Sequence, residues 1–126
     1  QILGNMALSV PSFIKLGGDA LEGAIFTTSY LGEEVSKTSK LFVENYKNKY
    51  GDDPTFFAAF AYDGVGLIAS SLNSPSDVSG NFLLAKLSSI TNYDGATGTL
   101  SVGTDRKIRF PTRMVQVKSG KIIPLQ

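Results

Sequence analysis

The sequence predicts an α/β fold, and two observations on the order of its apolar segments support this. Short runs rich in apolar, β-branched and aromatic residues, such as residues 1–4 and 21–31, precede segments whose apolar residues recur at helical spacing. Beyond residue 98 the strand patterns return. The chain has 126 residues, of which 42% are hydrophobic and 18% charged, which is the length and composition of about one globular domain.

The first half is expected to contain two strands and two helices. Residues 1–4 form a short apolar run that Gly4 ends, as in a buried strand, and a loop leads to Pro11, which suits the first turn of a helix. Residues 21–31 predict a second strand, with Glu22 and Gly23 at its entrance. From Glu33 to Gly51 the pattern is that of an amphipathic helix, with acidic residues in its first turn and lysines in its last.

The second half opens on a helix over residues 55–72 that is apolar on nearly every face, which predicts burial on several sides. Gly64 and Gly66 inside it each cost about 1 kcal/mol relative to alanine, which suggests close packing of another backbone. A shorter helix is expected over residues 80–90, and residues 112–125 are predicted to form a hairpin that turns at "KSGK".

Composition and charge exclude several function classes. The formal net charge is +1 and the basic residues are spread along the chain, so the sequence predicts no basic patch that would bind nucleic acid. The chain has no cysteine and no histidine, which removes disulfides, thiol nucleophiles, zinc sites of the usual kinds and histidine-based catalysis. We therefore expect no catalytic residues, no metal and no cofactor. The start lacks an initiator methionine and the basic region of a signal peptide, so it reads like the middle of a longer chain.

The stretch "DGATG", residues 94–98, raises the question of a phosphate-binding loop. Such a loop needs a helix directly after it, because helix N–H groups and the helix dipole converge on the anion. Here the glycines are followed by "TLSV", which is strand-like. We interpret Gly95 and Gly98 as shaping the entry to a strand.

Taken in order, four segments resemble the branched-chain amino-acid binding family of periplasmic-type solute-binding proteins. They are "DALEGAIFTT", a helix that ends in Tyr-Gly-x-x-Pro, a buried helix with a Tyr-Asp-x-Val core, and Gly-x-x-Gly before the last strands. In this chain the Tyr-Asp-x-Val motif of the buried helix is Tyr62-Asp63-Gly64-Val65. The resemblance covers nearly the whole chain and corresponds to the C-terminal third of the family's two-lobed type I fold, which has parallel sheets flanked by helices.

The resemblance implies how the chain is divided between two lobes. By analogy, residues 1–50 and 108–126 belong to the second lobe and residues 51–107 to the first. The N-terminal part of such a protein is absent, and isolated parallel strands need neighbours and cover. We therefore expect the chain to pack against missing sequence, a partner chain or a copy of itself.

The function that the resemblance implies is capture of an amino acid, of branched-chain type or similar, between the lobes. Delivery to the membrane permease of an ABC importer would follow, in an extracytoplasmic location. The residue that we expect to receive the ligand's ammonium group is Glu22, beside Gly23. Met6 and Ala7, in the loop after the first strand, and Tyr30, at the end of the second, are further candidate ligand-binding residues.

Other interpretations stay open at this stage. A receptor or sensor domain of the same fold would have a different output, and a self-associating fragment would have no binding activity. An enzyme would have to use carboxylates such as Asp63 and Glu22 as general acids or bases. The chain has no histidine, no cysteine and no Gly-x-Ser-x-Gly elbow that would support catalysis. Tyr62 and Asp63 lie in the middle of an apolar helix, which favours a buried structural hydrogen bond or an interlobe contact over ligand binding.

Overall fold

The computed structural model describes residues 1–32, 36–72 and 79–125. In chain order the elements are β1 (Leu3–Gly4), η1 (Met6–Ser9), α1 (Pro11–Gly17), η2 (Gly18–Leu21), β2 (Ile25–Thr28), α2 (Lys37–Tyr50), α3 (Phe56–Ser71), α4 (Gly80–Ser88), β3 (Tyr93–Gly95), β4 (Gly98–Val102), β5 (Ile108–Arg109), β6 (Arg113–Lys118) and β7 (Lys121–Pro124). The α/β class predicted from the sequence is confirmed.

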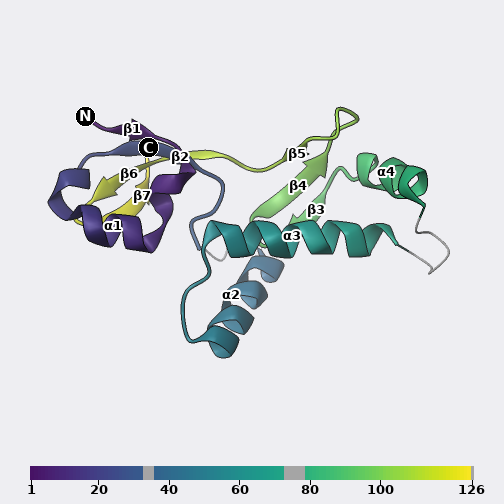
Figure 1. Cartoon of the computed structure of the whole chain (residues 1–126), viewed down its shortest axis with the longest axis horizontal. Helices are drawn as coiled ribbons and strands as arrows, with labels where there is room; N and C mark the ends of the chain where they lie inside the picture. The colour runs from purple at the N-terminus through teal and green to yellow at the C-terminus, as the bar shows by residue number, and fades with distance from the viewer. Residues whose placement is uncertain (33–35, 73–78, 126) are drawn as a thin grey trace.

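These elements gather around two separate sheets (Figure 1). The terminal body, residues 1–28 and 113–125, holds a sheet of order β1-β2-β6-β7 together with α1. The middle body, residues 36–110, holds a sheet of order β3-β4-β5 with α2, α3 and α4. Both chain ends lie in the terminal body, so the chain crosses from one body to the other and back.

Strand pairing differs from the parallel sheets that the family resemblance implies. Among the described pairings β1 and β2 run parallel, whereas β2–β6, β6–β7, β3–β4 and β4–β5 are antiparallel. The hairpins explain most of this difference, because strands joined by a tight turn must run antiparallel. Between β6 and β7 the turn has positive φ at Ser119 (51°) and Gly120 (70°), as a two-residue hairpin loop requires.

The terminal body is held by a small core between its sheet and its short helices. Strand β2 alternates, so that Phe26 and Thr28 are buried while Thr27 is exposed. The core consists of Leu21, Ala24, Phe26, Val115 and Val117, against which Leu8, Ile14, Leu31 and Ile122 pack.

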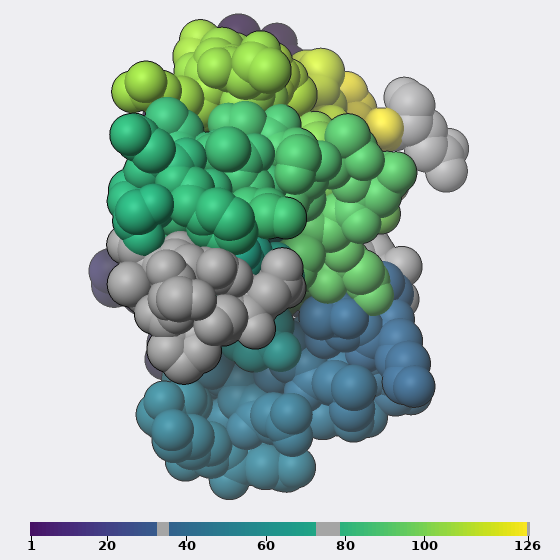
Figure 2. Space-filling view, turned by 90° about the vertical axis from the view of Figure 1, so that its right-hand side faces the viewer, coloured from purple at the N-terminus to yellow at the C-terminus, as the bar shows by residue number. Residues whose placement is uncertain are grey.

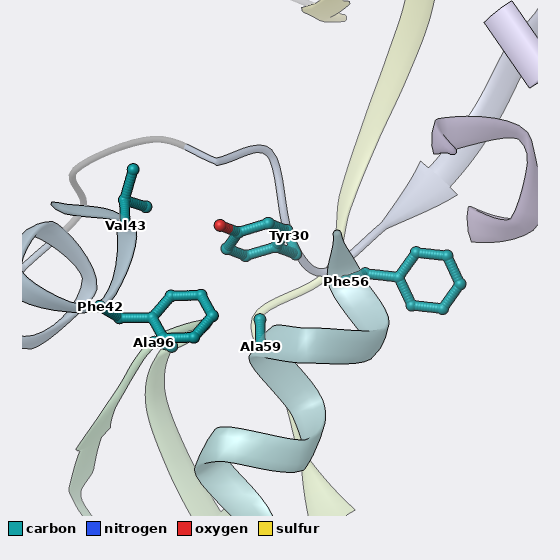
Figure 3. Packing of buried hydrophobic residues seen from close by; sticks show 6 residues of the cluster. All are labelled: Tyr30, Phe42, Val43, Phe56, Ala59 and Ala96. Carbon is teal, nitrogen blue, oxygen red and sulfur yellow. The ribbon is translucent and has the colours of Figure 1, made fainter. Parts of the chain in front are cut away.

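In the middle body, α2 and α3 pack together with the β3–β4 turn. Helix α2 begins at a capping box between Ser36 and Ser39 and ends at Gly51, whose φ of 74° is left-handed. The predicted helical start at Glu33 lies outside the described residues. Figure 3 shows the core that results, made of Tyr30, Phe42, Val43, Phe56, Ala59 and Ala96.

Helix α2 packs within the middle body. Phe42 and Val43 of α2 lie in one core with Phe56 and Ala59 of α3. The chain therefore leaves the terminal body before α2, between residues 28 and 36. It returns between Phe110 and Arg113. The division into lobes that the resemblance implies, with residues 1–50 and 108–126 in one lobe and 51–107 in the other, stays a prediction.

The "DGATG" stretch forms the β3–β4 hairpin, and a buried carboxylate holds its turn. Asp63 of α3 is 1% exposed and accepts hydrogen bonds from the Ala96 and Thr97 backbone N–H groups and from the Thr97 hydroxyl. A Cβ on Gly95 would meet the same carboxylate, and Gly98 has a φ of 109°. The N–H groups of the turn already donate to Asp63, so the glycines have a structural role and not an anion-binding one. The contacts also confirm the expected structural role of Asp63.

Helix α3 is less covered than its sequence predicts. Phe56, Ala59, Asp63, Leu67 and Ser71 are buried and form one stripe along the helix. Other apolar residues of the helix stay exposed, namely Phe57 (65%), Tyr62 (46%), Val65 (69%) and Ile68 (45%). The prediction of burial on several sides is therefore not met within the described part of the chain.

The two helix glycines differ in their surroundings. A Cβ on Gly66 would collide with the Tyr93 hydroxyl, whereas the space around Gly64 is open. The close neighbour is thus a side chain, and it accounts for one of the two glycines. Within the described ranges, no helix is both long and apolar enough to cross a membrane.

Candidate functional site

A cavity of about 310 Å³ lies where the two bodies meet. The terminal body contributes Ser9, Pro11 and Ile122, the crossing segment contributes Tyr30, Leu31 and Gly32, and the middle body contributes Asp53, Pro54, Thr55 and Phe56. Its size falls at the lower end of the range for small-molecule sites, about 300–1,000 Å³. Because four separate stretches of chain from the two bodies and the crossing segment form it, its shape depends on how the two bodies are arranged. We call it the junction cavity.

Tyr30 joins the junction cavity to the core of the middle body. It is 8% exposed, and its hydroxyl has no hydrogen-bond partner among the described residues. In Figure 3 this hydroxyl points to the side of Val43 and Phe42, while Phe56 points the other way. Burial, with Asp53 and Asp63 nearby, raises the pKa of Tyr30 to about 12. The phenol is thus neutral at physiological pH and offers one hydrogen-bond donor.

The loop after β1 brings two further predicted residues to the same region. Asn5 caps η1 by accepting a hydrogen bond from the Ala7 N–H at 3.0 Å, and Ser9 donates to the Met6 carbonyl at 2.7 Å. Met6 is partly buried and packs against the core that contains Tyr30, whereas Ala7 is exposed. Strands β1 and β2 are parallel, so the residues that follow each strand meet at one sheet edge. Met6, Ala7 and Tyr30 therefore follow strands that end on the same side of the sheet. Of the three, Tyr30 lines the junction cavity, whereas Met6 and Ala7 do not.

Glu22 lies elsewhere, at the opposite end of β2. It precedes the strand and Tyr30 follows it, with Ile25–Thr28 between them. The Glu22 side chain is exposed and accepts a hydrogen bond from the Ser119 N–H at 2.9 Å, in the β6–β7 turn. The structure thus places Glu22 where the sequence predicts, at the entrance of the strand, but does not bring it to Met6, Ala7 and Tyr30.

The segment before α3 contributes to the junction cavity without a local sequence signal for binding. Asp53 is the charged residue among those that line the junction cavity, and its carboxylate pairs with Lys47 Nζ at 2.7 Å. Phe56 supplies an apolar wall at the start of the helix. Both belong to the sequence "DDPTFF", in which a proline loop leads into an apolar helix, and this pattern predicts the start of a helix and not a binding site.

The arrangement suits binding of a small solute. Its lining combines apolar walls with hydroxyl groups and one carboxylate, and it contains no nucleophile with an adjacent base. Within the part of the chain that the structure describes, acidic side chains do not gather in a group that would hold a metal ion.

Comparison with known proteins agrees with this geometry. Residues 1–121 match the periplasmic binding protein family. The leucine binding protein LivK from Thermotoga maritima superposes with a TM-score of 0.85 at 26% identity, over 99% of this chain and 36% of that one. LivJ from Streptococcus pneumoniae, a branched-chain amino acid transporter substrate binding protein solved with isoleucine, gives 0.79 at 25% identity, over 96% and 35%.

A more distant structure shares the fold with another ligand. The solute binding protein of an ABC transporter from Rhodopseudomonas palustris, solved with 3,4-dihydroxybenzoic acid, gives a TM-score of 0.78 at 23% identity, over 99% of this chain and 35% of that one. A search of curated proteins gave no match. The chain spans about a third of the length of the solved structures that it matches. The chain therefore belongs to the periplasmic binding protein family, whose members are non-enzymatic solute-binding proteins.

Proposed function

We propose that this chain forms part of a two-lobed, extracytoplasmic binding protein that holds an amino acid, or a similar small solute, for an ABC importer. The observation that carries the proposal is the junction cavity, which is lined by both bodies and by Tyr30 of the crossing segment. A ligand bound there would contact both bodies at once, as capture between two lobes requires. The terminal body would then belong to one lobe and the middle body to the other.

The similar structures support a carboxylate-bearing ligand. LivK is named a leucine binding protein, LivJ holds isoleucine, and the protein from Rhodopseudomonas palustris holds 3,4-dihydroxybenzoic acid. These ligands differ in size and charge but share a carboxyl group and an apolar part. The two amino-acid binding proteins are the more similar in sequence, so branched-chain amino acids are the first ligands to test.

We assign the contacts of this chain to the edge where Met6, Ala7 and Tyr30 meet. The Tyr30 hydroxyl is a buried donor that lacks a partner among the described residues, and such a group is costly to keep unless something satisfies it. A polar group of a bound solute would satisfy it. The contact of Glu22 with the ligand's ammonium, which the family resemblance implies, is the competing prediction, because Glu22 lies at the other end of β2; the same experiment decides between the two.

Calorimetric titration of the two-lobed protein with leucine, isoleucine and valine tests both assignments. Tyr30→Phe removes one neutral hydrogen bond, worth about 0.5–1.5 kcal/mol, and should weaken binding by up to about tenfold. Tyr50→Phe removes the same group from an exposed tyrosine of α2 and serves as the control. Unchanged affinity in Tyr30→Phe would contradict the contact that we assign to the hydroxyl.

The variant Glu22→Gln tests whether the ligand binds at the Glu22 end of β2. If the carboxylate receives the ammonium group, its loss should cost about 2–5 kcal/mol of binding. If Glu22 only caps the β6–β7 turn through Ser119, affinity should stay the same.

A further inference from the structure

A second cavity, of about 330 Å³, lies between α2 and α3, away from the junction cavity. Figure 1 shows α2 running down from beneath α3, so that the two helices diverge. The lining includes Phe42, Asn45, Tyr46, Lys49 and Tyr50 of α2 and Tyr62 of α3. We call it the aromatic groove. It shares no lining residue with the junction cavity, so the two can bind different molecules.

A row of rings forms one wall of the aromatic groove. Phe42, Tyr46 and Tyr50 are four residues apart and therefore lie on one face of α2. The ring centroids of Phe42 and Tyr46 are 5.9 Å apart, and those of Tyr46 and Tyr50 are 4.6 Å apart. The Tyr62 ring adds a second wall, 4.9 Å from Phe42. Phe42 is 5% exposed and Tyr50 is 60% exposed, so the row begins in the core and ends at the surface, where ring faces are open to a ligand.

The composition of α2 indicates that this groove faces water in the longer protein too. Apart from Leu41 and Tyr50, the exposed residues of α2 are polar or charged, among them Lys37, Lys40, Glu44, Lys47 and Asn48. A helix face of this composition belongs in water, because burial of its charges would cost free energy. The open face of α3 differs, since its exposed side chains are apolar. Another part of the protein is therefore expected to cover α3 but not the outer face of α2.

The polar groups of the aromatic groove restrict the chemistry of a ligand. Lys49 Nζ lies 5.2 Å from the centroid of the Tyr50 ring and has no ion pair within the described ranges of the chain. Its positive charge disfavours a cation and favours an anion. The Asn45 amide and the tyrosine hydroxyls can both donate and accept hydrogen bonds. A matching ligand has C–H faces for the rings, several hydroxyls and a negative charge.

We propose that the aromatic groove binds an acidic carbohydrate, a pyranose that carries a carboxylate. The C–H face of the sugar ring packs on the tyrosine rings, its hydroxyls pair with Asn45 and the phenols, and its carboxylate lies beside Lys49. Proline-rich peptides also bind in aromatic grooves. They bring no negative charge for Lys49, so the charge of the site favours the acidic sugar. This site goes beyond the proposed capture of a solute between the bodies and does not depend on it.

Titration of the two-lobed protein with glucuronate and with glucose, followed by nuclear magnetic resonance, tests the proposal. The two sugars share the pyranose ring and differ in the carboxylate. Glucuronate should bind saturably and up to about fivefold more tightly than glucose, which is the range of an exposed ion pair. Lys49→Gln should remove this difference. Lys37→Gln removes the same charge from α2 outside the groove and should keep it.

A second variant tests the rings. Tyr50→Ala should weaken the binding of both sugars by up to about tenfold, the range of an aromatic contact. Leucine titrations of the Lys49 and Tyr50 variants should give the parent's affinity, and failure of leucine to bind at all would count against the proposed function alone. If Tyr50→Ala does not fold, as judged by circular dichroism, the lysine variants decide.

Three results would overturn the proposal. One is a glucuronate response that does not saturate or that saturating leucine abolishes, since the sugar would then bind nowhere in particular or in the junction cavity. Another is an equal loss in Lys49→Gln and Lys37→Gln. The third is binding of an octaproline peptide that Tyr50→Ala weakens, without binding of glucuronate, because the groove would then be a peptide site.

Discussion

Replacing Asp63 with asparagine is expected to lower the free energy of unfolding by about 2–4 kcal/mol. The Asp63 carboxylate accepts three hydrogen bonds from the β3–β4 turn and is 1% exposed. Asparagine keeps one acceptor oxygen and places an amide donor against the turn's own donors. The loss of charge weakens the bonds that remain, and a buried donor left unpaired costs about 1–3 kcal/mol more.

Urea denaturation followed by circular dichroism measures this loss. Asp94→Asn is the matched control, because Asp94 is an exposed carboxylate in the same hairpin and accepts one bond from Thr38. It should cost less than about 1 kcal/mol. A stability of Asp63→Asn within about 0.5 kcal/mol of the original chain would refute the role of this carboxylate in holding the turn.

Three further predictions follow from the same contacts. Gly98→Ala should destabilise the fold by about 1 kcal/mol or more, since φ is 109° there, and neither phosphate nor ATP should change its melting or that of the original chain. Between pH 10 and 12 the free energy of unfolding should fall by up to about 3 kcal/mol, because the unfolded phenol of Tyr30 ionises near 10 and the folded one near 12; an equal fall in the Tyr30→Phe chain would contradict this. The exposed apolar residues of α3, Val65 among them, should make the isolated chain associate at tens of micromolar, and sedimentation that shows a compact monomer would contradict this.

The association prediction concerns a defined surface. Val65 and Ile68 of α3, with Leu84 of α4 and Ile108 of β5, line an apolar groove of about 490 Å³. Figure 2 shows a neighbouring face of the middle body, with α2 in blue at the bottom and α4 with the β4–β5 connection in green above it. Val65→Asp should reduce association without disturbing the buried stripe of α3, which does not include Val65.

Local sequence signals predicted most of the elements because local physics decides them. The β6–β7 hairpin follows from "KSGK" between alternating strands, and α2 ends at Gly51 because glycine accepts the left-handed conformation. The "DGATG" turn was also predicted correctly, since a strand follows it. These features depend on residues that are close together in the sequence.

Contacts between distant residues were harder to predict. Asp63 and Thr97 are 34 positions apart, and the hydroxyls of Ser29 and Thr112 are 83 apart. No local pattern marks either pair. The packing partner of α2 is equally hard to predict, because an amphipathic helix shows that one face is covered but not which element covers it.

The candidate site shows the same limit. Met6, Ala7 and Tyr30 were predicted from the rule that ligands bind beyond the carboxyl ends of parallel strands, and the structure brings them to one edge. Asp53 and Phe56 reach the junction cavity only because α3 begins beside Tyr30. Glu22 was selected by the family resemblance of its Glu-Gly motif, which carries no information on which end of β2 faces the junction.

A crystal structure of the two-lobed protein with bound leucine tests the central claim most directly. We predict that the ligand occupies the junction cavity, in contact with both bodies and with Tyr30. A ligand bound outside this cavity, at the Glu22 end of β2 or within one body alone, would contradict it.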